Sequence, residues 1–563
     1  LFVSARRSMF SSDSARKSFL LLSMSGVVDI LKERVGLGDS NCYHRFCQLL
    51  GRLKANYQLT ELVRTDVYPQ WLELTANFTK ESLGNLHALS NSIHYLLTLW
   101  SRMVSAVPFV RGDGPSSANA AAAGRSSTLL SQYAPEVLNS YLEARLQLAQ
   151  MVASGESDNA DLEDQETAVM QVEQLPGLFR FQYDVSCRTL GGALDTLLQR
   201  HESLADVVGN AVLQQGASAV NGGDANATAA KQSLGVVEAQ LAWLVYIVGA
   251  IIGDAPFGSS SHGEGDEKLD AQLCRRVIML IMSIDRRLTR TQGVVKCDYR
   301  LEMAALYFLG SFRRTYFVES RGMPSPPAAI GSSSTQPMLD DSAAAAAGGG
   351  ARSLGESTSV RTGVLASRTS RVTQKAQQFN AMFDEMGLGD HVVVAPNFIK
   401  KLANNLAHWP ASETVLSNTL DVFQEMTHSY SSGKLLLALD IVHSLLLHHT
   451  EEHYKFLAPP ENGRLRTRFY MCVARLLYIS EDPDVMFEKF MSPIAASMDA
   501  AQASMSVKSE AVAAKVAGVC RDLRGIIAAA HNRRRYPLIF EVLYPQYFDM
   551  LVAVAGAWPD VRF

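Results

Sequence analysis

The stretch Asp39–Val107 reads DSNCYHRFCQLLGRLKANYQLTELVRTDVYPQWLELTANFTKESLGNLHALSNSIHYLLTLWSRMVSAV. In its last part, apolar residues recur every three or four positions, which is the spacing of one face of an α-helix. These residues are Ile93, Leu96, Leu97, Trp100, Met103, Val104 and Val107. A face this apolar has to be covered, so the pattern predicts a buried helix centred on Trp100.

The preceding helix is predicted to begin at Tyr68 and Pro69, because proline is tolerated at a first helical position, where its missing N–H has no partner. It directs Trp71, Leu74 and Phe78 toward the same interior. The two helices form an antiparallel pair. One pair cannot bury both of its faces, so we expect further pairs stacked on it in an array.

The composition agrees with such an array. At 563 residues the chain exceeds the size of one compact core, and 47% apolar residues rule out a wholly disordered chain. A net charge of −4 argues against a surface that binds nucleic acid over the whole molecule. The seven cysteines lack a CxxC pair, so we expect reduced thiols in a reducing compartment. They are Cys42, Cys47, Cys187, Cys274, Cys297, Cys472 and Cys520.

Two apolar segments resemble targeting or membrane sequences. The first residues, LFVSARRSMFSSDSARKSFLLL, mix basic, serine and apolar residues as a targeting peptide does. We favour the interpretation that these residues form helices leading into the array, and not a targeting peptide, as would be found in a chain that begins inside a longer protein. The block Leu241–Ile252 is shorter than the roughly 20 residues needed to span a bilayer, so it is interpreted as a buried helix and not as a membrane insertion.

Four segments rich in small or acidic residues are predicted to be loops, because they offer little apolar surface to bury. They are residues 111–127, 153–167, 215–230 and 253–268. A longer segment, residues 321–368, contains PSPP, serine runs, five alanines and three glycines, and we expect it to be a disordered insert. Deleting residues 325–365 should therefore leave the fold intact.

The array is predicted to resume after the insert. Its helices are expected near residues 371–386, 397–408, 412–430, 434–448, 464–479, 484–502, 506–530 and 534–555. The helix over 434–448 is apolar around most of its circumference, as an inner helix would be. The pairs recur about every 40 residues, as HEAT repeats do. The fold class is thus all-α, a superhelical α-solenoid of HEAT-like antiparallel helix pairs, with residues 1–320 and 369–563 as its two parts.

No catalytic or cofactor motif stands out. The sequence has no GxSxG nucleophile motif and no P-loop, and GLGDS near residue 36 lacks the lysine that would reach a phosphate. One group of side chains suggests a metal site but has the spacing of no helical zinc signature, so we favour a hydrated helix end there. The group is His443, His448, His449, Glu451, Glu452 and His453. We expect no enzyme activity, no metal and no cofactor.

The sharpest polar motif is Arg521-Asp522-Leu523-Arg524-Gly525. Two arginines beside an aspartate are able to bind an acidic partner surface. Alternatively, Arg521, Asp522 and Arg524 tie successive repeats together through buried polar contacts. We favour the second interpretation and keep the first open.

Several longer segments resemble the exportin-seven group of the importin-β (karyopherin-β) nuclear transport receptors, in the same order along the chain. They are SNCYHRFCQLLGRLKANYQLTELV (40–63), YPQWLELTANFTKESL (68–83), NSIHYLLTLWSRMVSAVPFV (91–110), LAWLVYIVGAIIG (241–253), FIKKLANNLAHW (398–409), LLLHHTEEHYKFL (445–457), CRDLRGIIAA (520–529) and EVLYPQYFDML (541–551). The resemblance covers the central portion of the family protein. The family's amino-terminal Ran-binding region is not recognisable ahead of Asp39.

This resemblance implies a receptor that carries protein cargo through the nuclear pore and shuttles between nucleus and cytoplasm. Its implied partners are Ran in the GTP form, cargo, and the phenylalanine-glycine repeats of nucleoporins. Energy would enter only through GTP hydrolysis on Ran. A static HEAT scaffold without a Ran cycle is the alternative, and the direction of transport is left open.

Overall fold

The structure is a computed structural model that describes residues 5, 7–110, 117–156, 165–254, 265–316, 391–428, 430–480, 483–504, 509–530 and 536–557. Every regular element within these ranges is a helix. The helices of the first part are η2 (Arg7–Met9), α1 (Asp13–Glu33), α2 (Ser40–Asn56), α3 (Leu59–Val63), α4 (Tyr68–Leu83), α5 (Leu86–Ser105), α6 (Val107–Val110), α7 (Ser117–Ala153), α8 (Gln165–Val172), α9 (Pro176–Phe181), α10 (Tyr183–Gln215), η4 (Ala219–Asn221), α11 (Ala225–Gly253), α12 (Asp266–Arg290) and α13 (Tyr299–Tyr316).

The second part begins after residue 390. Its helices are α15 (His391–His408), α16 (Glu413–His428), α17 (Tyr430–Leu437), α18 (Asp440–Leu447), η5 (Lys455–Leu457), η6 (Pro460–Asn462), α19 (Gly463–Ile479), α20 (Pro483–Ser504), α21 (Glu510–Ala529), α22 (Tyr536–Leu543) and α23 (Gln546–Ala557).

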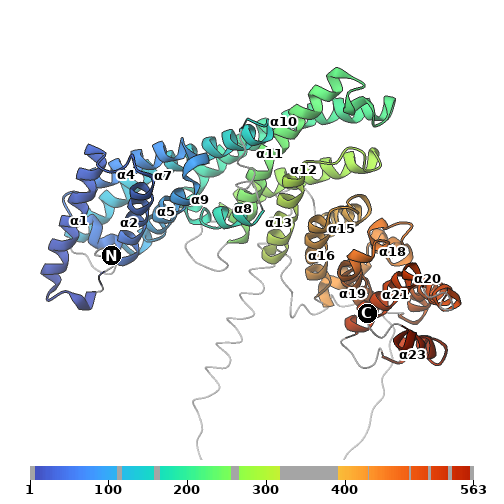
Figure 1. Cartoon of the computed structure of the whole chain (residues 1–563). Coiled ribbons are helices and arrows are strands. Elements are labelled where there is room, and N and C mark those ends of the chain that lie inside the picture. Colours follow the sequence, from blue (N-terminus) through green and yellow to red (C-terminus); the bar gives the residue numbers. More distant parts are fainter. Residues whose placement is uncertain are drawn as a thin grey trace, which may run out of the picture.

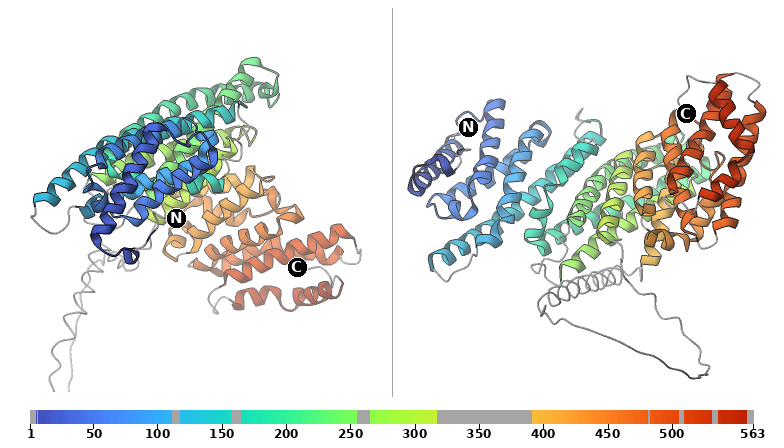
Figure 2. Two further views of the ribbon diagram at one scale, coloured as in Figure 1. Left: turned by 60° about the vertical axis from the view of Figure 1, so that its left-hand side comes forward. Right: turned by 90° about the horizontal axis from the view of Figure 1, so that it is seen from below.

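The helices pack in two adjoining rows. In one row α1 lies on α4 and α4 on α7, and in the other α2 lies on α5 and α5 on α9. Further along the chain, α11, α13, α16, α19 and α21 form a row in which each helix packs on the next. The result is an elongated array that bends after α13, as Figure 1 shows, and Figure 2 shows the same stacking from two other sides. The predicted all-α solenoid is confirmed.

The apolar stripe on α5, which continues to Val107 at the start of α6, is buried as its spacing predicts. All seven residues from Ile93 to Val107 are at most 8% exposed, and Trp100 is fully buried. The indole Nε1 of Trp100 donates a hydrogen bond of 3.1 Å to Thr79 Oγ1 of α4, so the polar atom of the ring also has a partner. Trp71 and Phe78 of α4 are buried too.

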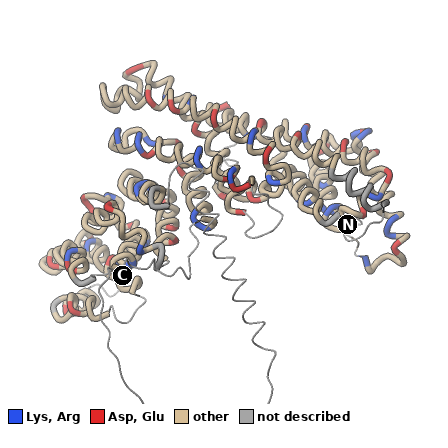
Figure 3. The backbone as a smooth tube through the Cα atoms, turned by 180° about the vertical axis from the view of Figure 1, so that it is seen from behind, with Lys and Arg blue, Asp and Glu red and all other residues tan. Residues whose placement is uncertain are grey.

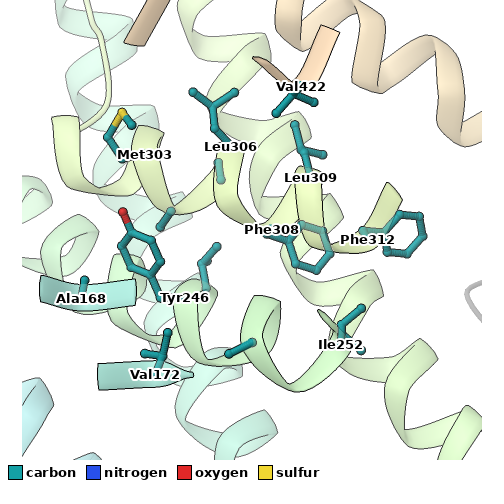
Figure 4. Close-up of a cluster of buried hydrophobic side chains, with 14 of the residues drawn as sticks. Ala168, Val172, Tyr246, Ile252, Met303, Leu306, Phe308, Leu309, Phe312 and Val422 are labelled. Carbon is teal, nitrogen blue, oxygen red and sulfur yellow. The ribbon is translucent and has the colours of Figure 1, made fainter. Parts of the chain in front are cut away.

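The centre of the array is the contact between α11 and α13. A Cβ atom on Gly249 of α11 would lie 2.9 Å from the ring of Tyr307 in α13, so only glycine permits this close approach. Figure 4 shows the core at this contact, with Tyr246 and Ile252 of α11, Met303, Leu306, Phe308, Leu309 and Phe312 of α13, Ala168 and Val172 of α8, and Val422 of α16.

Helix α11 also contains the apolar block that resembles a membrane segment. It is the one unbroken described helix long and apolar enough to cross a bilayer, and 89% of its most apolar window is buried inside the protein. The pair α22 and α23 passes the same test only when joined, and it is bent by 73°. Burial against α7, α10 and α13 accounts for the composition of α11, as in the core helix of a solenoid.

Helices extend into all four predicted loops, so those predictions are wrong there, and two of the segments are helical over six residues or more. Residues 117–127 belong to α7, and residues 225–230 belong to α11. Both segments are rich in alanine, the residue with the highest helix propensity. Asp224 caps α11 by accepting hydrogen bonds from the backbone N–H groups of Asn226 and Ala227. Ala227 and Ala230 are buried in a second small core with Val208, Val212, Val220 and Val295.

Two predicted helices of the second part are broken. The helix predicted over 434–448 is split into α17 and α18 by a turn at Ala438 and Leu439. The helix predicted over 534–555 is split into α22 and α23 before Pro545, since a residue preceding proline disfavours the α conformation. The predicted helix near 371–386, the insert 321–368 and the boundaries drawn from it lie outside the described residues, and they stay predictions.

Candidate functional site

Asp522, the centre of the polar motif, faces the interior of the array. It lies on α21 and is 2% exposed. Arg466 of α19 donates to both of its carboxylate oxygens, and the distance from Nη2 to Oδ2 is 2.7 Å. Arg466 Nη1 also donates to Glu451 Oε1 and to the carbonyl oxygen of Leu457, both at 2.6 Å. This arrangement links α21, α19 and the segment before α19.

Asp522 and Arg466 are both buried, away from bulk water. Burial raises the pKa of Asp522 to about 7, although the hydrogen bonds and positive charge of Arg466 oppose the rise. Burial acts to lower the pKa of Arg466, but the hydrogen bonds and charge of Asp522 raise it above its usual value. Asp522 therefore depends on Arg466 for the cation that offsets its burial, whereas Arg466 also binds Glu451 and the carbonyl oxygen of Leu457.

The two arginines of the motif lie differently from the aspartate. Arg521 is half-buried, and its backbone carbonyl accepts a hydrogen bond of 3.2 Å from Thr467 of α19. Arg524 is exposed to solvent. Within the motif, Asp522 thus forms a buried contact between helices, and Arg524 is an exposed cation. Of these charged side chains, a binding partner can fully reach only Arg524 in this conformation.

Gly525 brings α21 close enough to α19 for this buried contact. A Cβ atom at this position would lie 2.4 Å from the carbonyl oxygen of Thr467 and 2.9 Å from Cβ of Tyr470. These distances are shorter than any ordinary contact, so the backbones approach more closely than an alanine would allow.

A second buried ion pair, which was not predicted from the sequence, connects α13 and α15. Lys401 Nζ donates to Glu302 Oε2 at 2.6 Å, and Asn405 Nδ2 donates to Glu302 Oε1 at 2.5 Å. Glu302, Lys401 and Asn405 are all fully buried. Burial acts to lower the pKa of Lys401, but the negative charge of Glu302 raises it. No local signal reveals this pair, because its members are 99 residues apart.

Two further buried carboxylates, Glu238 and Asp270, connect helices in the middle of the array. Glu238 of α11 accepts hydrogen bonds from Arg287 of α12 and from the backbone N–H of Asp298, the latter at 2.7 Å. Burial acts to raise the pKa of Glu238, but the charge of Arg287 lowers it overall. Asp270 of α12 is bound by Arg180 at 3.2 Å. Four buried carboxylates thus join helices that are distant in sequence.

The histidines that suggested a metal site do not gather around one point. His449 is fully buried, and its Nε2 lies 2.9 Å from the carbonyl oxygen of Phe490. His448 is exposed and caps α18 through the carbonyl oxygen of Ser444 at 2.9 Å. The expectation of a hydrated helix end is therefore wrong for His449 and fits His448. Among the described residues, no three His, Cys, Asp or Glu side chains lie where they could bind a metal.

Charged residues of both signs occur along the described array, as Figure 3 shows. Cations and anions alternate over the helices, in keeping with the small net charge of −4. A receptor for one strongly charged polymer would concentrate one sign on one face. In this view neither sign is gathered on one segment of the described array.

Comparison with known proteins gives one consistent result. Residues 148–465 match the family described as "Exportin-7-like, TPR domain". The chain is 32% identical to Ran-binding protein 17 of Homo sapiens over 568 residues, which cover 99% of this chain and 44% of that protein. It is 31% identical to Exportin-7-B of Xenopus laevis, again over 99% of the chain and 44% of the relative.

A more distant relative shows the same pattern. Exportin-7 of Dictyostelium discoideum is 27% identical over 99% of the chain and 47% of its own length. The chain therefore spans less than half the length of these relatives. The family description assigns the repeats to the TPR type, whereas the period of the sequence suggested HEAT-like pairs.

Proposed function

The chain belongs to the exportin-7-like family, and from this premise we propose that the protein is a nuclear transport receptor of the exportin type. It carries protein cargo through the nuclear pore in a cycle governed by Ran. The observation that carries this proposal is the family match over residues 148–465, supported by relatives named Exportin-7 and Ran-binding protein 17 that align with 99% of the chain.

The architecture supports a transport role. In an array of helix pairs, each pair contacts its neighbours only, so small changes at many contacts add up to a change in curvature. Such a surface can exist in several conformations, and a ligand selects among them if it binds one better than the others. A receptor that loads and releases cargo needs this property.

The proposed partners are Ran in its GTP form, protein cargo and the phenylalanine-glycine repeats of nucleoporins. Cargo and RanGTP bind together in the nucleus, and both are released in the cytoplasm after GTP is hydrolysed on Ran. The receptor itself is not an enzyme and requires no cofactor. We include neither direct nucleic-acid binding nor membrane insertion in the proposal, and the protein is located in both the nucleus and the cytoplasm.

The alternative is a static helical scaffold that does not cycle with Ran. The two functions differ in whether the protein crosses the pore. We would tag the full-length gene product with a fluorescent protein, bleach the cytoplasm repeatedly and follow the nuclear signal. A shuttling receptor loses its nuclear signal within minutes. A nuclear signal that persists unchanged would favour the scaffold and contradict the transport proposal.

A further inference from the structure

The two parts of the array meet at a joint formed by four helices. Helices α12 and α13 come from the first part, and α15 and α16 come from the second. Helix α12 packs on α15, and α13 packs on α16. Between α13 and α15 the chain runs through residues 317–390, which lie outside the described residues. The contacts across the joint come from described residues on the two sides of this segment.

The centre of the joint contains a charge whose cation comes from the opposite side, while the Cys297 thiol on its own side donates only a weak hydrogen bond of 3.2 Å to Glu302 Oε2. Glu302 of α13 is fully buried, and both of its carboxylate oxygens accept hydrogen bonds from α15, one from Lys401 and one from Asn405. Asn405 Nδ2 also donates a hydrogen bond of 3.3 Å to Thr419 Oγ1 of α16. If α15 were absent, the carboxylate and the ammonium would each have to be hydrated again or stay buried without an opposite charge.

Apolar and polar contacts surround this cluster. Phe312 of α13 meets Phe398 of α15 edge to face, with ring centroids 5.5 Å apart. Asn404 of α15 donates to Asp285 of α12 at 2.7 Å, and Arg313 of α13 donates to Glu425 of α16 at 3.1 Å. The face of α15 that packs in the core is almost completely buried; it comprises Val394, Ala395, Phe398, Ile399, Leu402 and Leu406.

We infer that this joint is a self-sufficient interface, which keeps the two parts of the array assembled when the backbone between them is cut. The apolar contacts supply attraction, as they do in a protein core. The Glu302 cluster supplies selectivity, because any helix without a matching cation placed against α13 would leave a buried carboxylate without an opposite charge. The joint therefore pairs residues 265–316 with residues 391–428 of this chain, whether or not a peptide connection persists.

The test is to cut the folded chain. A protease recognition sequence with flexible spacers is inserted after Ala345, the purified 563-residue protein is cleaved, and denaturing electrophoresis confirms that the cut is complete. Size-exclusion chromatography then follows both pieces at about 1 µM, where a contact of micromolar affinity or better persists. We expect the pieces to elute together at the position of the uncut chain with unchanged helical circular dichroism. Elution as two separate species would overturn the inference.

Two variants test whether the charge cluster sets the pairing. Lys401→Met leaves Glu302 buried without its cation, and we expect the cut pieces to associate at least about a hundredfold more weakly. Glu302→Gln combined with Lys401→Met removes both charges, so association should be at least about tenfold stronger than in the single variant. The double variant keeps the test valid if the single variant folds poorly.

The matched control is Arg188→Ala. Arg188 pairs with Asp184 on the surface of α10, and their side chains are 72% and 70% exposed. Removing an exposed pair far from the joint should leave the association of the cut pieces unchanged. Equal association in Lys401→Met and Arg188→Ala would show that the buried cluster does not set the pairing.

Discussion

The guanidinium of Arg466 donates two hydrogen bonds to the carboxylate of Asp522, with Nη2 2.7 Å from Oδ2. This contact joins α19 to α21 across 56 residues of sequence. It brings the aspartate of the sharpest polar motif into the interior and leaves Arg524 of the same motif in solvent. The two interpretations of the motif therefore make different predictions for neighbouring residues.

Replacing Asp522 with Asn should lower the free energy of unfolding by about 3 kcal/mol, because Arg466 would stay buried beside a neutral amide. Arg524→Ala, two residues along on the exposed side, should change it by less than about 0.5 kcal/mol. Urea unfolding followed by circular dichroism measures both. An Asp522→Asn protein as stable as the parent would mean that the contact with Arg466 contributes little.

The second prediction concerns the stripe on α5. Trp100→Ala removes a fully buried ring and leaves its hydrogen-bond partner Thr79 in a cavity, so we expect a loss of roughly 3 to 5 kcal/mol. Leu22→Ala is the control, since Leu22 on α1 is 72% exposed. It should cost less than about 0.5 kcal/mol. Equal stabilities for the two variants in thermal unfolding would contradict the burial of this face.

The third prediction tests the close approach of α19 and α21. Gly525→Ala places a methyl group against the Thr467 carbonyl oxygen, and overpacking of this kind costs about 1 to 3 kcal/mol. Gly192→Ala on α10 meets no atom within 4 Å and should be neutral or stabilising by up to about 1 kcal/mol, because alanine favours the helix. If both variants gain stability in the same urea experiment, the helices are not in tight contact at Gly525.

The fourth prediction concerns pH. Burial lowers the pKa of His449 to about 4, below its unfolded value near 6.5. Because the unfolded chain binds this proton first, the contribution of His449 is complete above pH 6.5 and is lost as the pH falls from 6.5 toward 4. Between pH 6.5 and 5 the loss is about 2 kcal/mol. The pKa of Asp522, raised to about 7 by burial, acts in the opposite direction throughout this range, so variants must be compared at each pH.

The comparison uses two neighbouring histidines. His449→Gln keeps an N–H donor for the Phe490 carbonyl oxygen but cannot be protonated, so its stability should fall less between pH 6.5 and 5 than that of the parent. His448→Gln alters an exposed side chain and should follow the parent curve. Parallel pH curves for the parent and His449→Gln would show that His449 does not titrate as its burial requires.

The sequence was sufficient where a local pattern determines burial. The stripe containing Trp100 predicts the position and the buried face of α5, because the helical period places those residues on one side. Prediction from the sequence failed where helix propensity and a lack of large apolar side chains indicate different structures. Residues 225–230 lack large apolar side chains, which suggested a loop, yet alanine propensity and the Asp224 cap make them helical.

The contacts between repeats were beyond the reach of sequence patterns. Asp522 was singled out from its local motif, but its partner Arg466 lies on another helix, and only the packing of α19 on α21 brings them together. Glu302 and Lys401 carry no local signal at all, since an isolated Glu or Lys on a helix is usually exposed. Such pairs depend on tertiary structure, not on spacing.

The proposal that this protein is a Ran-dependent transport receptor is tested most directly by equilibrium binding of Ran to the full-length gene product. Ran loaded with a non-hydrolysable GTP analogue and Ran loaded with GDP are titrated in parallel, with and without cargo candidates. We predict much tighter binding of the GTP form, and cargo that raises it further by a coupling of about 1 to 3 kcal/mol. Equal, negligible binding of both forms would contradict the account and leave a static helical scaffold.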